Sequence, residues 1–542
     1  KTPIEEQFKR NIWMFENLSN HLCTQDEKEL FLKQVYKRFS TPNLKKDETK
    51  KINANSKEFY LDKIYNLSNQ NAFKNRRLIF KSLYKSAFID SFCESIGYVE
   101  KLRRGISFST PLKTNQDSIM IAISKLTTTG GGVYYEIKDI IEMYSDKKIY
   151  LLFTDLEIKE DINKDVLAEL SIYKNLNFIY GKKNSEDKIK TLFNRVIDIA
   201  PEKIYYYCGH NNVFLNALIQ SDISKNICVF SFDHGFSLGL DNSNYDCYVT
   251  KRPSDYEMLK KNYDKKVIYI PCWNKDKKTK NLNYIPFKRH EALITACAAA
   301  RFYKLQGEEN ENYIDFVLTL LSKTQGKHIH IGPINDDILN DIYTQMKEKK
   351  IAQEKFVYIP WSKNIIETLY ENCVDIFIEP FPTVSYKITL DVLSGGIPII
   401  SKDSHLRMQC ADFFYPKNLT WNNKEDFIDK LCNLSVNDLN LHSQLSRKYF
   451  QKNHELELLR EYFIQEKEFK MPQKTKCVDN IVLDINLIED FLVDRAVRTN
   501  NFKATFLEKV FSVKNNRDAD KCHKIVYILG VKIKIRNKKT TI

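Results

Sequence analysis

Residues 356–401 read FVYIPWSKNIIETLYENCVDIFIEPFPTVSYKITLDVLSGGIPIIS. Apolar runs at Phe356–Pro360 and Ile397–Ile400 flank a predicted buried strand at Val374–Glu379, and two segments with a helical pattern separate the three. Short apolar runs that alternate with helices are typical of a parallel, doubly wound sheet. The stretch therefore predicts a βαβαβ unit.

A loop at Pro380–Lys387 joins the second predicted strand to the helix that carries Asp391. In a doubly wound sheet, phosphorylated ligands bind where such a loop enters a helix N-terminus. The stretch contains neither the GxGxxG of dehydrogenases nor the GKS/T of P-loop ATPases. We interpret it as a nucleotide-binding half in which Asp391 holds the ribose; a surface carboxylate without a ligand is the alternative.

The composition describes a folded, basic protein. The chain has 542 residues, 43% of them hydrophobic, and a formal net charge of +14. This length predicts about three folding units, and the charge suits phosphate-bearing partners such as nucleotide-sugars, an anionic membrane surface or nucleic acid. No basic-aromatic motif for nucleic acid is visible, so we expect no nucleic-acid partner.

The cysteines favour a reduced compartment. Twelve cysteines occur without a CxxC pair, so we expect no metal site and a cytoplasmic protein. No signal peptide or apolar run of about 18 residues is visible. The apolar and basic alternation at 521–542 predicts either a hairpin edge around Gly530 or a strip that contacts anionic lipid at the inner face of the membrane.

The predicted fold class is α/β, with two Rossmann-like doubly wound lobes, a cleft between them and an all-α domain in front. The first 108 residues contain apolar residues at helical spacing, for example at Leu78–Phe92, and few glycines. The predicted boundaries are 1–108 for the helical domain, 109–282 for an acceptor lobe, 283–470 for a nucleotide-sugar lobe and 471–542 for a basic extension.

Two residues after the apolar run Val229–Phe232 are candidates for catalysis. Asp233 and His234 follow this predicted strand directly, where a side chain faces the crevice of a doubly wound sheet. A histidine there suits a general base near neutral pH, and the neighbouring carboxylate would orient it. A loop histidine with a structural hydrogen bond is the alternative.

Two other loops in the first lobe are candidates for binding the acceptor. His210 and Asn211 follow the predicted strand Lys203–Tyr207 and have the polar groups that a hydroxyl-rich ligand needs. Gly131, within Gly130–Gly132, allows the main chain to approach a ligand closely at a helix start. Three glycines alone are a weak signal.

Several residues in the second lobe are candidates for the donor. Lys304 follows a run of small residues, and His328 and His330 share one face of a short strand that ends at Gly332. Packed histidines and a solvated lysine are the alternatives. Main-chain atoms near Val357 and Tyr358 are expected to contact the base. The expected phosphate contacts are Ser385, Tyr386 and Lys387, just before the predicted helix that carries Asp391. Thr389 on that helix is a further donor candidate.

Four segments carry a resemblance to the GT-B glycosyltransferases, and more closely to glycosyltransferase family 41. These are AAARFYKL, HIHIGPINDDILNDI, DIFIEPFPTVSYKITLDVLSGGIPII and FDHGFSLG. The resemblance runs from Gly209 to Phe414 and is closest to the bacterial N-glycosyltransferases, with O-GlcNAc transferase more distant. It implies Lys304 as the diphosphate-binding lysine, Asp391 as the ribose ligand, and Asp233 with His234 as the acidic and histidine pair of the first lobe.

The chain also departs from these families. The loop reads TVSYK where family 41 is rich in Gly, Asn and Thr, and Ser231 stands where that family has a first histidine. A retaining subgroup of GT-B enzymes uses Glu-x7-Glu. Glu379 matches its first position, but Lys387 occupies the second, which favours an inverting mechanism.

These observations predict an inverting, metal-independent glycosyltransferase without a cofactor. Its donor would be a nucleotide-diphosphate sugar, with a UDP-sugar expected, and its acceptor a surface polysaccharide of the capsule type. Three alternatives stay open: a protein N- or O-glycosyltransferase, a transferase that moves a non-sugar group onto glycan, and a non-catalytic GT-B module that binds glycan or nucleotide.

Overall fold

The computed structural model describes the larger part of the chain. The described residues are 82–85, 87–126, 132–156, 158–181, 185–207, 213–230, 235–236, 239–277, 283–286, 292–299, 302–305, 312–382, 384–403, 411–471, 481–484, 511–518, 521–528 and 531–536. They fall into two units, of which the larger lies within Met14–Ile485. Each unit is described by itself.

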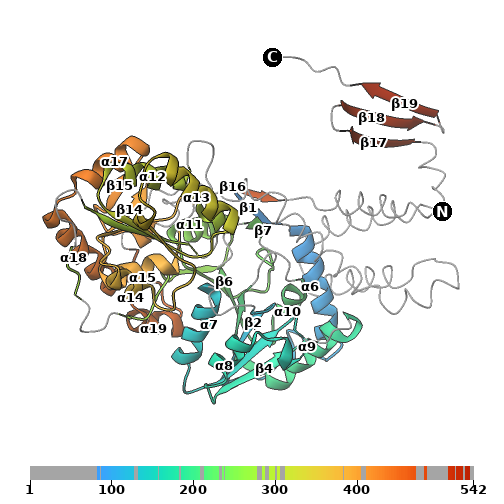
Figure 1. Ribbon diagram of the computed structural model, residues 1–542. Coiled ribbons are helices and arrows are strands. Elements are labelled where there is room, and N and C mark those ends of the chain that lie inside the picture. The colour runs from blue at the N-terminus through green and yellow to red at the C-terminus, as the bar shows by residue number, and fades with distance from the viewer. Residues whose placement is uncertain are drawn as a thin grey trace. The chain divides into compact units, whose positions relative to one another are not determined.

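The first large sheet has seven parallel strands in the order β4-β3-β2-β5-β6-β8-β9. Strands β2, β4 and β6 of this sheet are labelled in Figure 1. Its strands are β2 (Asn115–Ile123), β3 (Lys148–Phe153), β4 (Leu176–Tyr180), β5 (Pro201–Tyr207), β6 (Lys225–Phe230), β8 (Cys247–Thr250) and β9 (Lys266–Tyr269). The helices between them are α7 (Gly132–Met143), α8 (Lys164–Leu170), α9 (Ser185–Ile199), α10 (Val213–Leu218) and α11 (Pro253–Asn262). The first strand lies inside the sheet with later strands on both sides, as in a Rossmann fold.

The second large sheet has six parallel strands in the order β12-β11-β10-β13-β14-β15. Its strands are β10 (Ile294–Ala298), β11 (Lys327–Ile331), β12 (Phe356–Ile359), β13 (Ile376–Ile378), β14 (Ile399–Lys402) and β15 (Leu419–Trp421). The helices of this lobe are α12 (Tyr313–Lys323), α13 (Asp336–Glu348), α14 (Ile365–Glu371), α15 (Lys387–Gly395), α17 (Lys424–Asn433) and α18 (Val436–Asn453). Both predicted Rossmann-like lobes are therefore confirmed.

Alternate residues of the second sheet enter two different cores. Ile376 and Ile378 pack in one core with residues of α12 and α17, whereas Phe377 packs in the other with residues of α15 and α18. Successive side chains of a strand point to opposite faces, so a strand with helices on both faces is apolar throughout. This explains why β13 is apolar at all three of its residues, Ile376–Ile378.

Two crossings of the chain join the lobes. The linker residue Asn274 pairs with the segment that leads into α19 (Leu456–Ile464): its N–H donates to His454 O, and its carbonyl accepts from the N–H of Leu456, each at 3.0 Å. Phe463 on α19 then stacks on Tyr205 of the first lobe with ring centroids 5.1 Å apart. The chain thus returns to the first lobe after completing the second.

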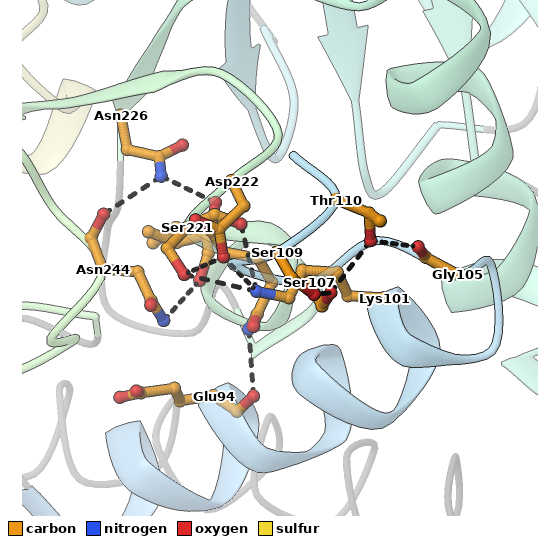
Figure 2. A network of polar contacts seen from close by, with 12 residues as sticks. Glu94, Lys101, Gly105, Ser107, Ser109, Thr110, Ser221, Asp222, Asn226 and Asn244 are labelled. Atoms are coloured by element: carbon orange, nitrogen blue, oxygen red, sulfur yellow. Dashed lines mark hydrogen bonds and ion pairs between the residues drawn. The ribbon is translucent and has the colours of Figure 1, made fainter. Parts of the chain in front are cut away.

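Helix α6 (Ala87–Leu102) packs against the first lobe through buried polar contacts (Figure 2). Lys101 is fully buried, and its ammonium donates to Asp222 Oδ2 at 2.9 Å and to Ser221 O at 3.2 Å. A buried ion pair contributes only where hydrogen bonds complete it, as they do here. The boundary at residue 108 stays a prediction; α6 contacts α9 and α10 of the lobe that follows it.

Asp90 on α6 makes a second buried connection to the first lobe. Its carboxylate accepts from the N–H groups of Gly239 and Asp241 at 2.7 and 2.8 Å and from Asn216 Nδ2 at 2.9 Å. Burial raises the pKa of Asp90 well above its ordinary value, and the nearby charge of Asp241 adds to the shift. This carboxylate therefore ties α6 both to α10 and to the chain ahead of β8.

Two small sheets complete the described residues. Strand β1 (Ser82–Lys85) pairs with β7 (Gly235–Phe236) and β16 (Ile481–Asp484). The helical prediction for Leu78–Phe92 is right from Ala87 and wrong at β1, because the pairing partners of β1 are distant in the sequence. Most of the predicted all-α domain lies outside the described residues.

In the smaller unit, β17 (Phe511–Asp518), β18 (Lys521–Ile528) and β19 (Val531–Arg536) form an antiparallel sheet. The register places Ile528 opposite Val531, so only residues 529–530 connect the last two strands. This agrees with the hairpin predicted around Gly530. The lipid contact stays a prediction.

Candidate functional site

The order in which the chain adds strands to the second sheet reverses between β10 and β13. The chain continues from β10 to β11 on one side, whereas β13 lies on the other side and leads to β14. In open α/β sheets, ligands bind outside the carboxyl ends of the strands at such a switch point. The segments that leave β10 and β13 at this edge carry Lys304 and the loop 379–386.

Lys304 brings these two segments together. It lies in the short helix η2 (Phe302–Leu305), and its Nζ donates to the carbonyl of Val384 at 3.2 Å. The same ammonium lies 5.4 Å from the centroid of the Tyr386 ring. The structure therefore places the predicted diphosphate-binding lysine against the loop that was predicted to bind phosphate.

Glu379, the first residue after β13, organises this loop. It is buried, and its carboxylate accepts from Ser385 N at 2.5 Å and from Thr389 Oγ1 at 2.9 Å. Burial raises the pKa of Glu379 to about 7, although these hydrogen bonds and the charge of Lys304 act in the opposite direction. Sequence reasoning missed Glu379 as a site residue, although its place directly after a buried strand is a signal for one.

Ser385 and Tyr386 immediately precede α15. Ser385 Oγ donates to the carbonyl of Ala298, the last residue of β10, at 2.8 Å. Tyr386 is the N-cap residue and has φ 51° and ψ −105°, a conformation that non-glycine residues rarely adopt. Backbone strain of this kind persists only where surrounding contacts hold it, and such contacts concentrate at functional sites.

Gly332 lies at the end of β11 for a packing reason. Its φ is +127°, and a Cβ atom there would lie 2.1 Å from the carbonyl oxygen of Ala299. The glycine thus allows the chain after β11 to touch the chain after β10. Its proposed contact with a donor stays a prediction.

The two histidines of β11 lie on one face, as predicted, and both are buried. Tyr313 Oη is 2.6 Å from His328 Nε2 and 2.9 Å from His330 Nδ1. Burial lowers the pKa of His330 to about 4, so its ring is neutral near pH 7. His330 Nε2 is buried and makes no hydrogen bond to the described residues. The packed alternative accounts for His328, and the donor role of His330 stays a prediction.

The residues predicted to contact the base lie on β12. Val357 and Tyr358 are half-buried, and Tyr358 Oη accepts from the N–H of Ile334 at 3.1 Å. Strand β12 pairs with β11, with Tyr358 opposite His330. They therefore lie at one side of the switch point, and two strands, β11 and β10, separate them from β13 on the sheet.

Lys387 and Asp391 extend from α15 toward the first lobe and the linker. Lys387 Nζ lies 2.5 Å from the carbonyl of Trp273 and 3.5 Å from Asp139 Oδ2 on α7. Asp391 accepts from Asn274 Nδ2 at 2.9 Å and from Lys277 Nζ at 3.0 Å. Burial raises the pKa of Asp391 despite the opposing charge of Lys277. Both side chains thus have protein partners, and their predicted roles toward phosphate and ribose stay predictions.

A buried group of charges lies beside these contacts at the junction of the lobes. Lys251, directly after β8, lies 3.4 Å from Glu136 Oε1 and 3.4 Å from the centroid of the Trp273 ring. Glu136 also accepts from the hydroxyl of Tyr207 at the end of β5. Burial lowers the pKa of Lys251, and Glu136 opposes the shift. Sequence reasoning missed this group because its members come from four separate segments.

Five predicted residues lie outside the described part of the chain. They are the candidate acceptor and catalytic residues Gly131, His210, Asn211, Asp233 and His234. The described residue next to the first of them, Gly132, starts α7, and a Cβ atom there would lie 3.7 Å from Lys387 Cγ. The start of α7 therefore lies against the start of α15.

Two further features concern metals and membranes. Among the described residues, no group of three or more His, Cys, Asp or Glu side chains is arranged to hold a metal ion. No helix in the described part of the chain combines the length and apolar character that a membrane-spanning helix needs.

Comparisons with known proteins give structural matches alone. No protein-family model matches the chain, and no curated protein matches it by sequence. A glycosyltransferase from Rickettsia africae ESF-5 is 12% identical over 65% of this chain and 98% of its own, with a TM-score of 0.49. The lipopolysaccharide outer core galactosyltransferase WaaB is 12% identical over 64% of this chain and 98% of its own, with a TM-score of 0.49.

A mutant O-GlcNAc transferase from Thermobaculum terrenum is also similar in structure. It is 10% identical over 86% of this chain and 98% of its own, with a TM-score of 0.47. Each of these is a protein to which the chain is similar. The fold itself rests on the two strand orders: paired Rossmann-type lobes joined by a linker are the arrangement of the GT-B fold.

Proposed function

We propose that this protein is a glycosyltransferase that uses a nucleotide-diphosphate sugar, with UDP-sugar as the expected donor. The observation that carries the proposal is the contact between Lys304 and the loop 379–386 at the switch point of the second sheet. A lysine from one strand end and a helix N-terminus from the next supply positive charge at one place. A leaving diphosphate requires that charge.

The donor would lie along the carboxyl edge of the second sheet. Lys304 and the N-terminus of α15, with Ser385 and Lys387, would stabilise the charge that develops on the diphosphate when the glycosidic bond breaks. Asp391 would hold the ribose after the ribose hydroxyls replace Lys277 as its hydrogen-bond donor. Main-chain atoms of Val357 and Tyr358 would contact the base, and the remaining donor contacts would come from His330, Gly332, Tyr386 and Thr389.

The acceptor would enter from the first lobe. Gly131, His210 and Asn211 would hold it, and His234, oriented by Asp233, would remove the proton from the attacking hydroxyl. Attack on the face opposite the leaving diphosphate inverts the anomeric carbon. Lys387 in place of a second glutamate eight positions after Glu379 supports this direction of attack.

We propose a surface polysaccharide of the capsule type as the acceptor. The basic sheet β17–β19 and the net charge of +14 suit an enzyme that works at an anionic membrane surface, on the cytoplasmic side. A protein acceptor follows from the resemblance to family 41. Product analysis with each acceptor class would distinguish the two.

The test is a thermal-shift screen with UDP, GDP, CDP, CMP and their common sugars, repeated with Asp391→Ala and Lys304→Ala. A rise in melting temperature with one nucleotide, lost in both variants, is expected. Binding of a glycan polymer without any nucleotide would contradict the proposal and favour a non-catalytic module.

A further inference from the structure

Arg252 is a buried cation of the first lobe that faces the start of α15. It follows β8 directly, is 3% exposed and is the N-cap residue of α11. Its Nε and Nη2 donate to the two carboxylate oxygens of Asp255 at 2.8 and 2.7 Å. This two-point contact fixes the plane of the guanidinium.

The third guanidinium nitrogen crosses to the second lobe. Arg252 Nη1 donates to the hydroxyl of Tyr386 at 3.0 Å, and the two residues are 134 positions apart in the chain. The guanidinium carbon also lies 5.9 Å from the centroid of the Tyr386 ring. One side chain of the first lobe thus holds the residue whose backbone begins α15.

Tyr386 is held from the second lobe as well. Its ring meets the edge of Phe413 at 5.7 Å, and Lys304 lies 5.4 Å from the ring centroid. A cation from each lobe therefore lies within about 6 Å of the ring centroid. Its φ of 51° is unfavourable without these contacts, so their loss would let the start of α15 relax.

We propose that Arg252 is a positioning residue for the nucleotide site. By holding Tyr386, it keeps the N-terminus of α15 and the adjacent Lys304 in the arrangement that binds a diphosphate. The affinity of the second lobe for its nucleotide then depends on a residue of the first lobe. This inference rests on the proposed function, which supplies the diphosphate ligand.

The experiment is a double-mutant cycle on UDP affinity. Tyr386→Phe removes the hydroxyl alone. Arg252→Lys keeps a positive charge near Asp255 but cannot donate to both Asp255 and Tyr386 as the planar guanidinium does. Each single variant is expected to weaken UDP binding by about 5- to 20-fold. If the two residues act through one contact, the double variant should bind UDP no more weakly than the more affected single variant does. Calorimetry gives the affinities, and melting temperatures are recorded for all four proteins.

Tyr370→Phe is the matched control. Its hydroxyl donates to the carbonyl of Gly395 at 2.6 Å, at the opposite end of α15. Tyr370 lies on α14, and this variant removes a tyrosine hydroxyl that contacts α15 far from its N-terminus, so its UDP affinity should match that of the wild type.

Two results would overturn the inference alone. Independent, multiplicative losses in the double variant would show that Arg252 and Tyr386 act separately. Lower melting temperatures with unchanged UDP affinity would show a purely structural contact. If the wild type binds none of UDP, GDP and CDP, the proposed function fails, and this inference fails with it.

Discussion

The ammonium of Lys304 lies 3.2 Å from the carbonyl oxygen of Val384, 80 residues further along the chain. This contact joins the segments that leave β10 and β13. Glu379 holds the segment after β13 by accepting hydrogen bonds from Ser385 and Thr389. A cation, a helix N-terminus and a buried carboxylate therefore converge at one sheet edge.

Replacing Lys304 by alanine should abolish most donor turnover. If the ammonium stabilises the leaving diphosphate, kcat should fall by about 100-fold or more, as for other charge-stabilising groups. Steady-state assays with UDP-sugar measure this, and circular dichroism checks the fold. Lys355→Ala is the control. Lys355 also donates to a main-chain carbonyl, that of Thr324 at 2.9 Å, but it lies directly before the start of β12 and not at the carboxyl edge of the sheet. Near-normal turnover in Lys304→Ala would remove the assignment.

Glu379 should make the stability of the protein depend on pH. Burial raises its pKa from 4.5 to about 7, so the unfolded protein releases this proton first as the pH rises. The favourable contribution is complete below about 4.5 and is lost as the pH rises through 7. Relative to Glu379→Gln, the wild type should lose roughly 3 kcal/mol of unfolding free energy between pH 4.5 and 8.

Urea denaturation of both proteins at several pH values measures this difference. Glu354→Gln, at an exposed glutamate of the same lobe, is the control and should follow the wild type. A constant difference between wild type and Glu379→Gln across the pH range would show that Glu379 does not titrate there.

Gly332→Ala should destabilise the second lobe strongly. The new Cβ would lie 2.1 Å from Ala299 O in a backbone with φ of +127°, so the chain after β11 must move. We expect a loss of about 3 kcal/mol or more in unfolding free energy. Gly105→Ala is the control: its φ is +72°, but nothing lies within 4 Å, so strain alone should cost about 1–2 kcal/mol. Equal losses would mean that the close approach to Ala299 is unimportant.

Asp139→Ala should weaken the junction of the two lobes. Asp139 Oδ2 accepts from Trp273 Nε1 at 3.0 Å and lies near Lys387, and all three are largely buried. Removing the carboxylate takes the acceptor from the buried indole N–H and a counter-charge from the buried ammonium. The free energy of unfolding should fall by about 2–4 kcal/mol. Chemical denaturation followed by tryptophan fluorescence measures this.

The control for Asp139 is a more exposed ion pair. Asp315 pairs with Lys424 at 2.5 Å and is 41% exposed, so Asp315→Ala should cost less than about 1 kcal/mol. A loss as large as that of Asp139→Ala would mean that burial at the junction adds nothing.

Much of the second lobe could be predicted from residues 356–401. The expected strands and helices occur as β12, α14, β13, α15 and β14, with ends that differ by a few residues. Local hydrophobic period distinguishes these elements, because a strand buried on both faces is apolar throughout and a helix is apolar on one side. Chain order then implies a parallel sheet.

The sequence by itself therefore determined the two lobes, their strand-end loops and Lys304 as a cation of the second. Only the tertiary structure decided which side chains meet. Arg252 reaches Tyr386, Glu379 receives the N–H of Ser385, and Lys387 turns toward Asp139. The first and last of these contacts join different lobes, so no local pattern encodes them. They exist because packing brings together chain segments whose distance in sequence says nothing of their distance in space.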